Sequence, residues 1–99
     1  MDPVDVARLR AAVKRLAAGR PGQAVELRIP PYIAVQLGSP DGGPVHRRGT
    51  PPAVVEMTGP TFLALIDGQT TWAEALADHL ISASGAHADL GGLFASPNT

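Results

Sequence analysis

The stretch VVEMTGPTFLALIDGQTTWAEALADHLISASGAHADLGGLF, residues 54–94, decides the fold of this 99-residue chain. The stretch begins with apolar residues. A short apolar run follows and stops at Gly68, and a second run begins after Thr71. Thr71 and Glu74 stand three residues apart, which is the capping-box pattern of a helix start. A short run of mostly small residues follows and ends at Gly85, where the chain is expected to turn. This order predicts a strand, a short helix, a capped helix, a short strand and a terminal helix.

The residues before this stretch predict one helix and further strands. Asp2 can cap a helix that begins at Pro3, and Gly19 followed by Pro21 ends it. The strands that the whole sequence predicts lie at residues 25–29, 32–37, 45–48, 53–57 and 81–84. We therefore expect an α+β fold over residues 1–99 as one domain, with helices packed on one face of a mostly antiparallel five-stranded sheet.

The composition excludes several classes of protein. Apolar residues make up 44% of the chain and charged residues 17%, which suits a small packed domain, and the net charge of -1 does not favour nucleic acid. There is no cysteine, so disulfides, thiolate zinc sites and a cysteine nucleophile are excluded. The opening residues lack the pattern of a signal peptide, so we expect none, and no run of about 18 apolar residues occurs. We expect no integral membrane segment and a cytoplasmic, bacterial protein.

Residues with catalytic or metal-binding chemistry do not form a recognisable motif. The three histidines, His46, His79 and His87, lack the spacing of a metal site. The serines lack the G-x-S-x-G elbow of a hydrolase, and the carboxylates form no obvious pair. We therefore expect no catalytic residues, no metal, no cofactor and no enzymatic activity.

Three segments of the sequence are distinctive: AAGRPGQAVELRIPPYIAVQ at the entry to the sheet, HRRGTPP followed by VVE, and TWAEALA followed by SASGAHADL. Together they resemble a small bacterial branch of the sterol carrier protein 2 superfamily. The resemblance runs from about Ala17 to Leu93, and the phrase RGTPPxVVE is its most specific part. Ala53 departs from the asparagine expected there, and the chain is shorter than the eukaryotic lipid carriers.

The resemblance implies a hydrophobic pocket that binds or transfers a lipid, fatty acyl or sterol-like molecule without chemistry. Apolar residues between sheet and helices would line this pocket, and polar residues at its rim would hold a head group. The candidate lining residues are Ile33, Val35, Val55, Phe62, Leu65, Ile66, Trp72, Leu76 and Leu80. The candidate rim residues are Gln36, Arg47 and Arg48.

Each of these assignments has a structural alternative. The apolar residues can fill a dry core, and the two arginines can form solvated ion pairs with Glu26, Glu56 or Asp41. The whole chain would then be a ligand-free interaction module, a homodimer, or an accessory to a separately encoded enzyme. The two interpretations differ in the interior, because a carrier needs an apolar cavity and an interaction module needs a filled core.

Overall fold

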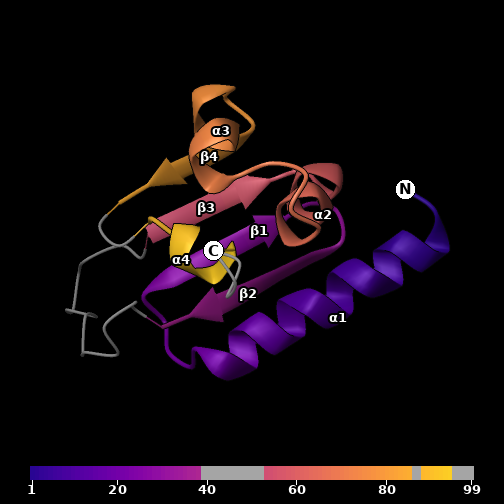
Figure 1. The fold of residues 1–99 in the computed structure, drawn as a ribbon. Helices are drawn as coiled ribbons and strands as arrows, with labels where there is room; N and C mark the ends of the chain where they lie inside the picture. Colours follow the sequence, from indigo (N-terminus) through magenta and orange to yellow (C-terminus); the bar gives the residue numbers. More distant parts are fainter. Residues whose placement is uncertain (39–52, 86–87, 95–99) are drawn as a thin grey trace.

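The computed structural model describes residues 1–38, 53–85 and 88–94. Figure 1 shows a sheet with helices gathered on the side that faces the viewer. The elements in chain order are α1 (Pro3–Gly19), β1 (Val25–Ile29), β2 (Ile33–Leu37), β3 (Ala53–Met57), α2 (Gly59–Ile66), α3 (Trp72–Ala77), β4 (Ile81–Ser84) and α4 (Gly91–Phe94).

The N-terminal helix begins and ends where the sequence predicts. The Asp2 carboxylate accepts a hydrogen bond of 2.8 Å from the amide of Asp5, and Pro3 takes the first helical position. Leu9 and Val13, four residues apart on the helix, are fully buried. This apolar stripe holds α1 alongside β2, the outermost strand on that side of the sheet (Figure 1).

The described strands form a four-stranded mixed sheet in the order β2-β1-β3-β4. Strand β1 is antiparallel to β2 and parallel to β3, and β3 is antiparallel to β4. The expectation of a mostly antiparallel five-stranded sheet is therefore wrong for the described residues; the predicted strand at 45–48 lies outside them. Leu37 at the end of β2 and Ala53 at the start of β3 both flank Val25. The segment that joins β2 to β3 therefore begins and ends beside the first residue of β1. For this reason β3 runs parallel to β1.

The two faces of the sheet have opposite character. On the covered face, Leu27 lies between Val35 and Val55, and the helices shield this row from solvent. On the other face, which no described helix covers, the side chains are polar or small except for Val54. One row across that face, in strand order, is Ala34, Arg28, Glu56 and Ser82; the next is Gln36, Glu26, Val54 and Ser84.

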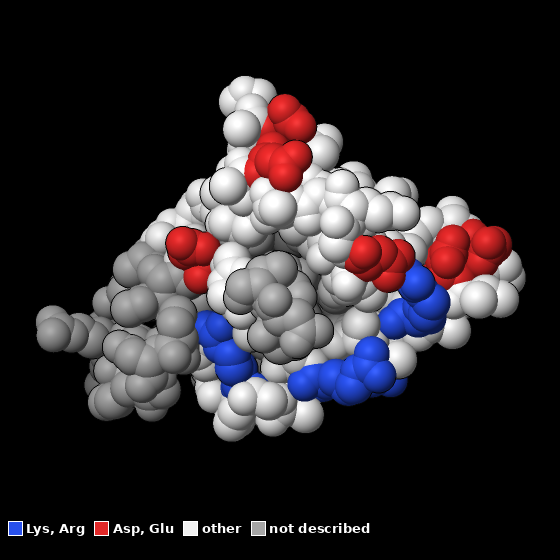
Figure 2. Space-filling view, in the orientation of Figure 1, with Lys and Arg blue, Asp and Glu red and all other residues white. Residues whose placement is uncertain are grey.

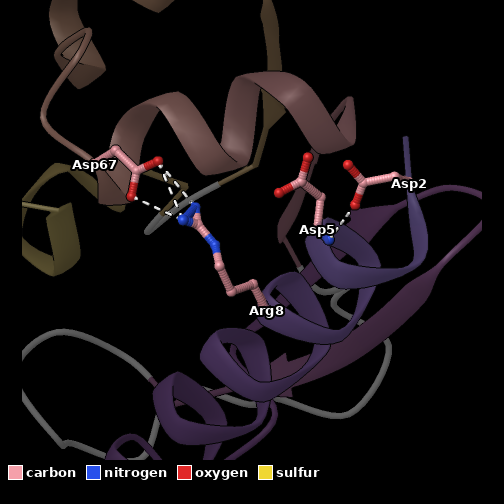
Figure 3. A network of polar contacts seen from close by, with 4 residues as sticks. All are labelled: Asp2, Asp5, Arg8 and Asp67. Atoms are coloured by element: carbon pink, nitrogen blue, oxygen red, sulfur yellow. Dashed lines mark hydrogen bonds and ion pairs between the residues drawn. The ribbon is translucent and has the colours of Figure 1, made fainter.

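Charged side chains on the helical side connect the first two helices. Figure 2 shows the basic side chains gathered over α1 and acidic ones at the edges of that cluster and over α3. Arg8 of α1 reaches Asp67, which caps the C-terminus of α2, with 2.9 Å between Nη2 and Oδ2 (Figure 3). Both side chains are about half exposed, so this ion pair contributes under about 1 kcal/mol.

Helix α3 ends in a Schellman turn whose left-handed residue is a histidine. The amide of His79 donates to the carbonyl of Leu76 at 3.1 Å, and the amide of Leu80 donates to that of Ala75 at 2.9 Å. His79 has a φ of 60°, the conformation in which glycine is usual at this position. An L side chain there costs about 1 kcal/mol of backbone strain.

Replacing His79 with glycine is expected to stabilise the fold by about 0.5–1 kcal/mol. Glycine relieves the backbone strain, and the entropy that it adds to the unfolded chain offsets part of this gain. Urea denaturation measures this change, and His79→Ala is the matched control because it removes the imidazole but keeps the Cβ. Equal stability of the glycine and alanine variants would contradict the assignment of strain to this residue.

Candidate functional site

Three aromatic side chains meet in the helical layer. Phe94 of α4 lies edge-on to Phe62 of α2, with 5.8 Å between ring centroids, and stacks on Trp72 of α3 at 6.1 Å. Phe62 is fully buried, whereas Trp72 and Phe94 are half-buried. We call Phe62, Trp72 and Phe94 the aromatic cluster; it joins the interior to the surface.

Helix α4 approaches the aromatic cluster closely because its first residue has no side chain. A Cβ placed on Gly91 would lie 3.2 Å from Cδ1 of Trp72. The amide of Gly91 donates to the Asp89 carboxylate at 2.8 Å, which fixes the start of this single helical turn. Leu90, just before the turn, is fully buried and anchors it to the core.

The structure brings six of the predicted lining residues to the layer between sheet and helices. Val55, Phe62 and Leu65 are almost completely buried there. Ile33, Val35 and Trp72 are half-buried and contact the same core. These residues therefore form one continuous apolar layer that reaches the surface at β2 and at the aromatic cluster.

The remaining predicted residues lie elsewhere. Ile66 and Leu76 are each 38% exposed and Leu80 is 48% exposed, so they stand outside the core. Gln36 lies on the uncovered face, where its amide donates to the Glu26 carboxylate at 3.2 Å, and so does not border the covered layer. Arg47 and Arg48 lie outside the described residues.

Phe94 is the member of the aromatic cluster that the sequence-based set of lining residues omits. The sequence predicts Phe94 on the terminal helix, and its aromatic side chain is the only local feature that points to a place in the site. Its contacts depend on how the chain folds back from β4 over α2 and α3, which no local pattern encodes.

The chemistry available at this site is apolar burial. Within residues 1–38, 53–85 and 88–94, no group of three or more His, Asp or Glu side chains could hold a metal ion. Over the same described parts of the chain, no helix combines the length and apolar character needed to cross a bilayer. The aromatic cluster and the layer beneath it offer apolar surface, and the rings of Trp72 and Phe94 are partly exposed.

Comparison with known proteins places the chain in a family. A search of curated proteins found no match. A family model described as "Bacterial SCP ortholog" matches residues 4–95, which include the described helices and strands except for the first residue of α1. The segments that resemble the bacterial sterol carrier branch fall inside this match. The chain belongs to the bacterial SCP ortholog family.

Proposed function

We propose that the protein binds and transfers an apolar or amphipathic small molecule, a lipid, fatty acyl or sterol-like compound, without catalysing a reaction. The observation that carries this proposal is the half-buried aromatic cluster, which leads from the surface to a continuous apolar layer. Membership of an SCP-like family supports a lipid-binding role in general.

In the proposed mechanism, the ligand replaces Phe94 against Phe62 and Trp72. Helix α4 is a single turn of four residues that includes two glycines and no fully buried residue, so displacing it removes mainly Leu93 and Phe94 from the core. Each aromatic pair that is lost costs about 0.5–1.5 kcal/mol. Burying an acyl chain contributes about 0.8 kcal/mol of favourable free energy per methylene. A chain of more than a few carbons therefore gains more than the lost aromatic pairs cost.

Removing the Phe94 side chain is expected to tighten ligand binding. Because the ligand no longer has to displace that ring from Phe62 and Trp72, Phe94→Ala should lower the Kd for oleate about five- to 150-fold, the equivalent of two aromatic pairs. Trp72 is the only tryptophan of the chain, so its emission during an oleate titration reports directly on the aromatic cluster.

Gly92→Ala is the matched control, since Gly92 lies on the same turn, is exposed, and would carry a Cβ that meets no atom within 4 Å. Its Kd should stay near the wild-type value. A Phe94→Ala variant that is destabilised yet binds oleate no better than wild type would contradict the displacement mechanism. Absence of any saturable change in Trp72 emission would contradict the binding site itself.

A further inference from the structure

We propose that the uncovered face of the sheet carries a second small-molecule site, which recognises an ammonium group attached to a compact apolar body. This site does not include the aromatic cluster that carries the proposed lipid function, because none of Phe62, Trp72 and Phe94 lines either hollow; Ile33 borders both this site and the covered layer. The site lies where β1 and β3 end and β2 and β4 begin, at Pro30.

Two adjoining hollows that share Pro30 form this site. The first has a volume of about 350 Å³ and is lined by Arg28, Pro30, Pro31, Tyr32, Ile33 and Ala34. The second has a volume of about 230 Å³ and is lined chiefly by Pro30, Glu56, Thr58, His79, Leu80 and Ser82. Ala34 and Arg28 line the first hollow and Glu56 and Ser82 line the second, so the two hollows lie next to each other along one row of the sheet.

The two hollows differ in chemistry. The first is mainly apolar, with proline rings and the Tyr32 ring as its surface. The second contains a carboxylate, an imidazole and hydroxyl groups. Arg28 is the register neighbour of Glu56, but its guanidinium turns along β1 to pair with Glu26. The Arg28 charge is thereby matched on its own strand, and Glu56 gives the second hollow its negative charge.

A second and independent observation points to the same place. His79 holds the left-handed conformation that the Schellman turn would accommodate better with glycine, and its side chain lines the second hollow. Strained residues of this kind are concentrated at binding sites. The His79 imidazole and the Glu56 carboxylate line the same hollow, an arrangement that the turn alone does not require.

These features define the ligand class by complementarity. An ammonium group would lie between Glu56 and His79, and an aryl or short alkyl body would lie on Pro30 and Tyr32 in the larger hollow. That hollow falls at the lower end of the size range of small-molecule sites, which suits a compact body and excludes a long acyl chain.

The test uses three probes with a common phenyl body: phenethylammonium, 2-phenylethanol and 3-phenylpropionate. Amide chemical shifts followed by NMR in the intact chain give both the location and the Kd of each probe. We expect phenethylammonium to bind most tightly and to shift the amides of Tyr32, Ala34, Glu56 and Leu80. The carboxylate probe should bind most weakly.

Two variants separate the proposed roles from structural ones. Glu56→Gln should weaken phenethylammonium about two- to five-fold, the usual range for an exposed charge pair, and leave 2-phenylethanol unchanged. Glu74→Gln is the control: it makes the same chemical change on α3, outside both hollows, and glutamine keeps the capping box. His79→Gly should weaken phenethylammonium binding even though it stabilises the fold.

Three results would overturn the proposal. They are equal affinity for the ammonium and carboxylate probes, shifts confined to the helical side, and no saturable shift up to about 20 mM phenethylammonium. Unchanged affinity in both Glu56→Gln and His79→Gly would do so as well. The oleate titration is unaffected by any of these results, because it reports on Trp72 on the covered side.

Discussion

Replacing Gly38 with alanine is expected to destabilise the protein by about 3 kcal/mol or more, near the upper end of single-substitution effects. A Cβ on Gly38 would lie 2.2 Å from the carbonyl oxygen of Pro21. That oxygen belongs to backbone that is already fixed: the Gly38 amide donates to the Arg20 carbonyl at 2.7 Å, and Arg20 Nη2 donates to the Gly38 carbonyl at 3.0 Å. The clash therefore cannot be relieved by turning a side chain.

Urea denaturation followed by circular dichroism measures this loss of stability. Gly19→Ala, at the end of α1, is the matched control because a Cβ there meets no atom within 4 Å. Alanine is the better helix former, so Gly19→Ala should be neutral or stabilise by up to about 1 kcal/mol. A Gly38→Ala variant as stable as wild type would show that α1 does not join β2 through this close approach.

Replacing Phe62 with alanine is expected to cost about 3–5 kcal/mol of unfolding free energy. Phe62 is fully buried at the centre of the core and supports the edge of the Phe94 ring. Its removal leaves a cavity and also takes away one of the two ring contacts that hold α4. Thermal unfolding followed by both circular dichroism and Trp72 emission measures the loss.

Leu80→Ala is the control for Phe62→Ala, because it truncates a large apolar side chain that is 48% exposed. We expect it to cost less than about 1 kcal/mol, since little apolar surface returns to water. A cost for Leu80→Ala close to that for Phe62→Ala would mean that the core extends further toward β4 than the structure indicates.

The sequence predicted best what short-range chemistry determines. Helices α1 and α3 begin after Asp2 and Thr71, because each of these side chains accepts a hydrogen bond from the amide three residues later. The alternation of apolar residues likewise placed Ile33 and Val35 on the covered face of β2. Local hydrogen bonding and the two-residue period of a strand suffice for these predictions.

Features that depend on distant pairing could not be predicted in the same way. The parallel pairing of β1 and β3 follows from where the chain returns after Leu37, which strand patterns do not encode. On α3, the sequence-based prediction chose Leu76 as a lining residue because its side chain is large. In the structure, Ala75 is the fully buried residue instead. Consecutive helical residues point about 100° apart, so burying Ala75 turns Leu76 toward solvent.

The central claim is that this protein carries a lipid-like molecule, and native mass spectrometry of protein purified under non-denaturing conditions tests it most directly. The account predicts a stoichiometric mass increment that disappears after solvent extraction and returns with an added fatty acid, acyl-CoA or sterol. A bare mass before and after such additions would contradict it, and a bare dimer would instead favour an interaction module.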